Sequence, residues 1–231
     1  DNLSHIAHNV QIGENVIIAI EKAARTCYKS EHKIIRDEAK NIAISGRDLV
    51  RKLISNEHEA MLEFGGNVAV KFTCDRGVSH ELVRHRLASF AQESTRYCNY
   101  GNDHVTFIIP HWLRISEGIY SEIPHASKAS VIWIENMLSC ERNYKELLEM
   151  DWTPQLARDV LPNALKTEIN ISANIREWRH IFKLRTAISA HPSMRHLMIP
   201  LLLELNSKIP IVFEDLTNSI TLDYENNMYI S

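Results

Sequence analysis

Apolar side chains recur at helical intervals in six segments of the chain. In the second segment, for example, Ile42, Leu49 and Leu53 fall on one side of a helix. Pro154 stands where a helix can begin, and Pro162 follows the fourth segment as a stop. The predicted helices cover residues 14–28, 36–55, 126–150, 155–161, 174–189 and 192–205.

Three shorter segments are predicted to be strands. Apolar and polar residues alternate over 67–74 and over 165–173, which is the period of a strand with one buried face. An apolar and aromatic run over 104–109 predicts a third strand, ended by Pro110.

A further helix is expected after the first strand, because Asp75 is a good helix N-cap. This helix carries Arg84 to Arg86 in its last turns, and a loop beyond it holds Ser89 to Thr95. The elements together predict an α+β fold, a mixed helix-and-sheet domain with a central sheet flanked by helices. The fingerprint G-x-G-x-x-G does not occur in the sequence, so we do not expect a dinucleotide-binding Rossmann fold.

Length and composition predict one globular domain over residues 1–231, since 45% of the residues are hydrophobic and no repeat or long linker interrupts them. The formal net charge is −3, so we expect no nucleic acid and no anionic membrane as partner. No apolar run approaches the length of a membrane span, and the polar segment 1–4 does not resemble a secretion signal. We therefore expect a cytoplasmic protein.

Cysteine and histidine residues show no metal-binding pattern. The four cysteines are widely spaced without a C-x-x-C pair, and the twelve histidines include no H-E-x-x-H motif. We expect no metal site and reduced thiols.

The densest group of cationic residues lies in the segment 84–97, which reads R-H-R-L-A-S-F-A-Q-E-S-T-R-Y. Its three arginines present rigid forks of donors that match phosphate oxygens, and Ser94 and Thr95 add hydroxyl groups. The pattern is typical of a phosphate site. The alternative is a basic surface that only faces water.

A second group lies in the segment 174–185, which reads N-I-R-E-W-R-H-I-F-K-L-R. On a helix, Arg176 and His180 share one face, so they can contact one ligand together. Arg179 and Lys183 are expected to face water. The apolar side chains are expected in the core: Trp178, Ile181, Phe182 and Leu184.

Three blocks of sequence, in the same order, resemble the flavin-dependent thymidylate synthase family, also called thymidylate synthase-complementing proteins. The first block is R-H-R at 84–86, followed by seven residues and Ser94, and it continues through Arg96 and Tyr97. The second is A-R-D-V-L-P at 157–162, and the third is the segment 174–185.

The resemblance implies a methyltransferase that converts dUMP to dTMP. Reduced FAD gives a hydride to the pyrimidine ring, methylenetetrahydrofolate supplies the one-carbon unit, and NADPH reduces the flavin. Members of this family are homotetramers whose sites are shared between subunits. We therefore expect a homotetramer that binds dUMP and folate substrates.

The resemblance also implies roles for individual residues. Arg185 is the expected catalytic residue, because a guanidinium beside the uracil stabilises negative charge that develops on the ring. The expected FAD-binding residues are Arg84, His85, Arg86, Gln92, Asn174, Arg176 and His180. The expected dUMP-binding residues are Glu81, Arg84, Ser94, Thr95, Arg96, Arg158 and Arg185.

Several positions depart from the family pattern. Gln92 takes the place of a usual glutamate, which removes a charge from the site, and the sequence leaves open whether Glu93 compensates. Glu81 stands where glutamine is frequent, and Ala60 stands where a hydroxyl is frequent. These departures affect substrate contacts more than the fold.

Two other functions stay open. Gln92 and Glu81 are compatible with a related flavoenzyme that modifies another pyrimidine nucleotide. A non-enzymatic nucleic-acid-binding protein could use the segment 84–96 as a basic patch, but the net charge of −3 and the lack of a stacking motif argue against it.

Overall fold

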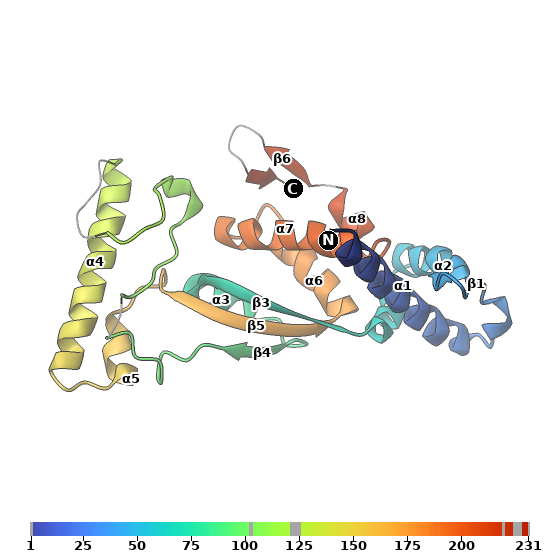
Figure 1. Ribbon diagram of the computed structural model, residues 1–231, viewed down its shortest axis with the longest axis horizontal. Helices are drawn as coiled ribbons and strands as arrows, with labels where there is room; N and C mark the ends of the chain where they lie inside the picture. The colour runs from blue at the N-terminus through green and yellow to red at the C-terminus, as the bar shows by residue number, and fades with distance from the viewer. Residues whose placement is uncertain (1, 102–103, 121–125, 219, 224–227, 231) are drawn as a thin grey trace. The chain divides into compact units, whose positions relative to one another are not determined.

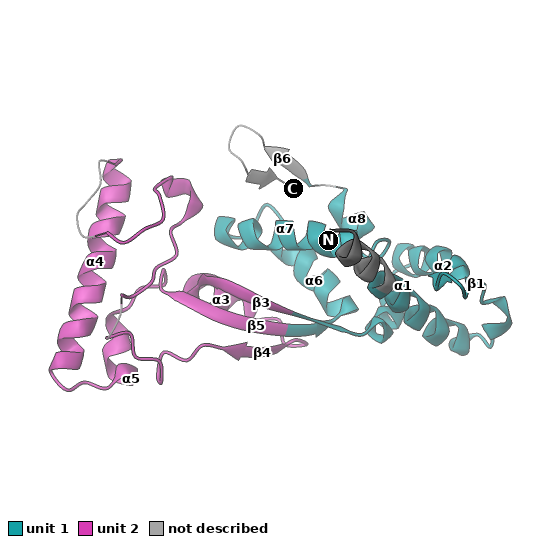
Figure 2. Cartoon of the chain, viewed as in Figure 1, with its two compact units in different colours: residues 1–69, 172–231 teal, residues 70–171 magenta. Residues whose placement is uncertain are grey.

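The computed structural model describes the chain except residues 1, 102–103, 121–125, 219, 224–227 and 231 (Figure 1). Helices and small sheets alternate irregularly along the chain, which confirms the α+β class. The backbone falls into two compact units, which we call unit 1 (residues 1–69 and 172–231) and unit 2 (residues 70–171) (Figure 2). That the whole chain behaves as one domain stays a prediction.

The largest sheet has three strands in the order β3-β5-β4 (Figure 1). Strands β3 (Asn67–Asp75) and β5 (Lys166–Asn174) confirm two predicted strands. Strand β4 (Ser89–Gln92) lies where a loop was predicted, so that prediction is wrong. The segment is a strand because it pairs with β5, and the pairing continues just beyond it, where the Glu93 N–H donates to the Glu168 carbonyl at 2.9 Å.

In unit 1, α1 (Asn2–Cys27) confirms the first predicted helix, whereas α2 (Ile44–Ser55) begins later than predicted. Residues 36–43 instead form a short antiparallel hairpin of β1 (Arg36–Asp37) and β2 (Ile42–Ala43). Asn41 explains the difference, because its φ of 51° is left-handed and a right-handed helix cannot pass through it.

Two buried carboxylates of α1 hold the start of α2. Glu14 accepts a hydrogen bond from the Ala43 N–H at 2.8 Å, and Glu21 accepts one from the Ser45 hydroxyl at 2.7 Å. Gly65 ends the 3-10 helix η2 (Glu59–Gly65), and a Cβ there would lie 2.9 Å from the Ile175 side chain. Glycine at this position therefore lets η2 pack closely in the core of unit 1.

Helix α6 (Ile175–Arg185) begins directly after β5 and ends earlier than the predicted limit of residue 189. Asn174 caps it as expected, with its side chain accepting from the Glu177 N–H at 2.9 Å. Trp178, with Ile181 and Phe182, is buried as predicted, and its indole N–H donates to the Val68 carbonyl at 2.9 Å. Leu184 is 49% exposed, so its placement in the core is wrong.

The C-terminal part of unit 1 continues with α7 (Pro192–Lys208), which confirms a predicted helix, and α8 (Glu214–Thr217). It ends in an antiparallel pair, β6 (Thr221–Asp223) with β7 (Met228–Ile230).

In unit 2, α3 (Arg76–Leu82) is capped by Asp75, which accepts from the Val78 N–H at 2.7 Å as expected. The helix is shorter than predicted, and residues 84–86 follow it rather than forming its last turns. The hydrogen bonds change here to the tighter i to i−3 type, for example from the His85 N–H to the Leu82 carbonyl at 3.1 Å. The arginines of this segment are therefore presented on a turn.

Two further predicted helices of unit 2 are confirmed, whereas the short 3-10 helix η3 (His111–Leu113) was not predicted. Helix α4 (Lys128–Glu149) is the long predicted helix, and Pro154 opens α5 (Pro154–Ala157), which continues as the 3-10 helix η4 (Arg158–Val160). The prediction of a strand over 104–109 is wrong, because the segment forms only one isolated antiparallel bridge, from Phe107 to Leu165, just before β5. Helices in the described part of the chain are too short or too polar to cross a membrane.

Candidate active site

The first predicted block ends in a turn, residues 94–97, which directly follows β4 and Glu93. The carbonyl of Ser94 accepts from the N–H groups of Tyr97 at 3.1 Å and Cys98 at 2.9 Å, which closes the turn. The Ser94 hydroxyl oxygen accepts from the Arg96 N–H at 3.3 Å. We call this segment the 94–97 turn.

Two predicted dUMP-binding residues from different sequence blocks meet at this turn. The guanidinium of Arg158 donates to the Thr95 hydroxyl oxygen at 3.1 Å, although the residues are 63 positions apart. Thr95 is buried and Arg158 is half-buried, while Arg96 is exposed beside the Tyr97 ring, 5.3 Å from its centroid. Unit 2 therefore gathers hydroxyl groups and guanidinium groups in one place, which is a donor set suited to phosphate.

The R-H-R segment lies on the turn that follows α3. Arg84 and Arg86 are exposed, whereas His85 is only 5% exposed. Glu81 is half-buried in the last turn of α3. The two arginines thus present their donors to solvent, and the histidine between them packs inward.

Gln92 makes contacts that suit an amide rather than a carboxylate. Its Nε2 donates to the Ser79 hydroxyl oxygen at 2.9 Å and to the Thr167 hydroxyl oxygen at 3.2 Å. The Ser79 hydroxyl already donates to the Arg76 carbonyl at 3.0 Å, so it offers a lone pair to position 92. Ser79 and Thr167 therefore give the Gln92 amide suitable hydrogen-bond partners, although the family usually has glutamate at this position. No local sequence pattern predicts these two contacts.

In unit 1, α6 carries the third block. Arg176 and His180 are exposed on this helix, one turn apart as predicted, and Arg185 is its last residue. The Arg176 guanidinium donates to the Glu63 carboxylate at 2.6 Å, and no local sequence pattern predicts this partner, which lies 113 positions away. Helix α6 thus places three of the predicted ligand-binding side chains on one rigid element.

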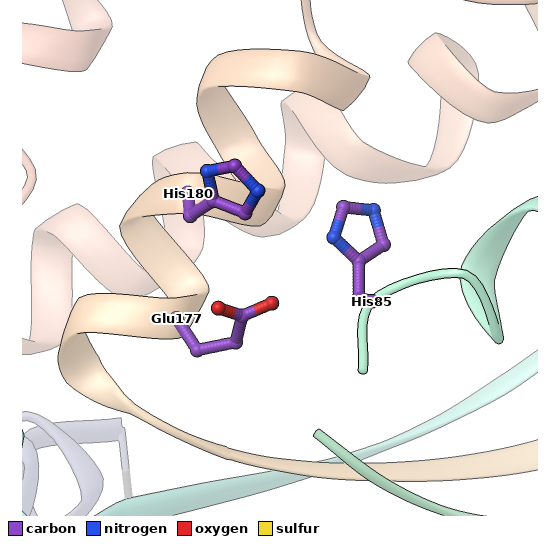
Figure 3. Close-up of side chains that lie close together, drawn as sticks. All are labelled: His85, Glu177 and His180. Carbon is purple, nitrogen blue, oxygen red and sulfur yellow. The ribbon is translucent and has the colours of Figure 1, made fainter. Parts of the chain in front are cut away.

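Glu177 is a buried carboxyl beside these residues. Figure 3 shows Glu177 and His180 projecting from the same side of α6, and it also shows His85 on the turn after α3. Burial raises the pKa of the Glu177 carboxyl above its usual range, an effect opposed by the charges of His180 and Arg176. In the sequence, the spacing of three residues between Glu177 and His180 is the feature that places both side chains on one face of the helix.

Arg179 is buried, so its prediction as a water-facing residue is wrong. Its side chain is 1% exposed and donates to both carboxylate oxygens of Asp215, at 2.7 and 2.8 Å, to Glu59 at 3.3 Å, and to the Val212 carbonyl. Lys183 is 46% exposed and also contacts Glu59, at 2.8 Å. Arg179 therefore joins α6 to η2 and α8 within unit 1.

Comparison with known proteins places the chain in a family. Residues 14–211 match the family model described as "Thymidylate synthase complementing protein". Three similar curated proteins are each named flavin-dependent thymidylate synthase. The protein from Corynebacterium diphtheriae is 31% identical over 88% of this chain and 80% of its own length. The protein from Geobacter sulfurreducens is 30% identical over 85% and 80%, and that from Mycobacterium marinum is 32% identical over 85% and 78%.

The family model covers most of the chain and includes all three sequence blocks, with the 94–97 turn, Arg158 and helix α6. The chain therefore belongs to the thymidylate synthase complementing protein family.

Proposed function

We propose that the protein is a flavin-dependent thymidylate synthase that reductively methylates dUMP to dTMP. The observation that carries this proposal is the hydrogen bond between Arg158 and Thr95, because it joins two of the three sequence blocks into one set of phosphate-binding donors. Family membership supports the same reaction class.

The nucleotide contacts divide by chemistry. Ser94, Thr95, Arg96 and Arg158 bind the phosphate and ribose, and Glu81 and Arg84 border them. Arg185 contacts the uracil ring. A guanidinium at that position stabilises the negative charge that develops on the ring when C6 accepts a hydride, and it costs no reorganisation if the helix already holds it in place.

The cofactor is a flavin, and we propose FAD. When bound, it supplies the hydride that NADPH provides, while methylenetetrahydrofolate is the carbon donor. The chemistry of the R-H-R turn suits a diphosphate, because Arg84 and Arg86 both expose guanidinium groups there and such groups match phosphate oxygens. The residues proposed to hold FAD are Arg84, His85, Arg86, Gln92, Asn174, Arg176 and His180.

The state of two of the four thiols supports a mechanism in which neither of these two cysteines is a nucleophile. Cys74 is buried on β3, and burial raises its pKa to about 12. Burial also raises the pKa of Cys140. A thiol with a raised pKa stays protonated near neutral pH, and the protonated form is a poor nucleophile.

Beyond the single chain, we propose a homotetramer in which residues of different subunits complete each site. Closed symmetric oligomers allow such shared sites, since the same surfaces recur in every subunit. A cytoplasmic location and the preference for NADPH over NADH stay predictions.

The test is turnover by the purified protein. With NADPH and methylenetetrahydrofolate, dUMP should yield dTMP, dCMP should give no methylated product, and the protein should show a flavin absorption spectrum. Methylation of dCMP instead of dUMP would favour the related flavoenzyme that Gln92 makes conceivable. Salt-sensitive binding to DNA or RNA without flavin would overturn the enzyme assignment.

A further inference from the structure

The side chains of Glu93 and its neighbour Gln92 lie on different faces of the sheet. Successive residues of a strand point to opposite faces. Gln92 contacts Thr167 on β5, whereas Glu93 contacts the residues on either side of it, Lys166 and Glu168. Glu93 therefore does not replace the charge that the family usually has at position 92.

The Glu93 carboxylate instead forms hydrogen bonds that fix the chain before and after the 94–97 turn. Its Oε2 accepts from the Glu168 N–H at 3.2 Å and from Lys166 Nζ at 3.4 Å, which fixes the residue before the turn against β5. Its Oε1 accepts from the Tyr100 hydroxyl at 2.7 Å, which fixes the segment after the turn. The side chain is 18% exposed, so water screens these contacts only weakly.

The negative charge of Glu93 is balanced by the neighbouring Lys166. Burial lowers the pKa of Lys166, but its hydrogen bond to Glu168 and the charge of Glu93 outweigh this and leave the pKa raised. Burial and the hydrogen bond to Glu93 raise the pKa of Tyr100, so its hydroxyl remains a donor near neutral pH. A paired carboxylate can therefore lie next to a phosphate-binding turn without repelling the ligand.

We propose that Glu93 is a positioning residue that preorganises the 94–97 turn for the phosphate of the nucleotide. The inference rests on the proposed function, and it assigns to Glu93 a role that the family pattern does not give. A turn held before binding loses less conformational freedom when the ligand arrives, so its hydroxyls and Arg96 bind phosphate more tightly.

The test compares binding of dUMP with binding of deoxyuridine, which lacks the phosphate, to the flavin-loaded enzyme. Glu93→Ala should weaken dUMP binding about tenfold and deoxyuridine binding by less than about twofold. Glu93→Gln should lose less affinity for dUMP, because its amide oxygen can still accept a hydrogen bond from the Tyr100 hydroxyl or the Glu168 N–H. Glu149→Gln, at the exposed end of α4 in the same unit, is the matched control and should leave the binding of both ligands unchanged.

Equal loss of dUMP and deoxyuridine affinity in Glu93→Ala, or no loss of either, would overturn the inference. If Glu93→Ala does not fold, Tyr100→Phe removes only the hydroxyl donor and should reproduce the selective loss of dUMP. A wild-type enzyme that binds deoxyuridine as tightly as dUMP would instead refute the phosphate site itself, and with it this part of the proposed function.

Discussion

Arg179 shows which residue roles a sequence can and cannot reveal. The caps Asp75 and Asn174 were predictable, because each bonds a backbone N–H three residues later. The partners of Arg179, by contrast, are Asp215 and Glu59, 36 and 120 positions away. Only tertiary structure brings these carboxylates to Arg179, so the sequence alone predicts a solvated residue there.

Replacing Arg179 should strongly destabilise the protein. Arg179→Met should lower the free energy of unfolding by about 3 kcal/mol, because breaking a buried ion pair leaves its partners poorly compensated. Lys183→Met is the matched control, since Lys183 contacts the same Glu59 from an exposed position and should cost less than about 1 kcal/mol. Urea unfolding of the three proteins measures the difference, and equal losses in both variants would contradict the account.

The same contacts make stability depend on acid pH. Burial raises the pKa of Glu59, but the bonds and charges of Lys183 and Arg179 outweigh burial and lower it below its ordinary value of 4.5. The ionised Glu59 thus contributes stability above that value, and the contribution is lost as the pH falls through the lowered pKa. Free energies of unfolding measured above pH 4.5 and below the lowered pKa should show that Arg179→Met loses less stability on acidification than the wild-type protein does.

At the scale of elements, the predictions succeeded where one local pattern decides the structure. Strands β3 and β5 have clear alternation, and helices α4 and α6 have strong helical spacing and a cap. The prediction failed at β4, whose four residues form a strand only by pairing with β5. Pairing between distant segments leaves little trace in a single short stretch of sequence.

The cap of α6 offers a test of how this helix serves the site. Asn174→Ala should cost about 1 kcal/mol of stability. It should also weaken flavin retention, because Asn174 is itself a proposed FAD contact and because Arg176 and His180 project from the helix that it begins. Ser127→Ala removes the equivalent cap of α4, a hydrogen bond from the Ser130 N–H at 3.2 Å, and should cost similar stability without loss of flavin. Parallel loss of flavin in both variants would show that general destabilisation, and neither Asn174 nor the position of α6, is responsible.

At the scale of the whole molecule, the residues proposed to bind the ligands come from both compact units. The 94–97 turn and Arg158 belong to unit 2, whereas α6 with Arg185 belongs to unit 1. The order of the three sequence blocks was enough to predict the family, but a single chain cannot predict which subunit supplies each half of a site. This question needs an experiment on the assembly.

Mixing two inactive variants answers it. Arg158→Ala and Arg185→Ala should each keep no more than about a hundredth of wild-type activity alone, and a mixture refolded or exchanged into mixed tetramers should regain up to about a quarter of wild-type activity if sites are shared. Each regained site combines an intact unit 2 from one subunit with an intact unit 1 from another. A mixture that stays inactive, with mixed tetramers shown by mass spectrometry, would mean that each site lies within one subunit.

The most direct test of the proposed reaction separates its two half-reactions by stopped-flow measurement of the flavin. In wild-type enzyme, NADPH should reduce the flavin, and dUMP with methylenetetrahydrofolate should reoxidise it with formation of dTMP. Arg185→Ala should slow the dUMP-dependent step about a hundredfold, or about 3 kcal/mol, and leave reduction by NADPH nearly unchanged. Equal slowing of both steps, or of neither, would contradict the assignment of Arg185 to the uracil ring. Failure of dUMP to reoxidise the wild-type flavin would contradict the proposed reaction itself.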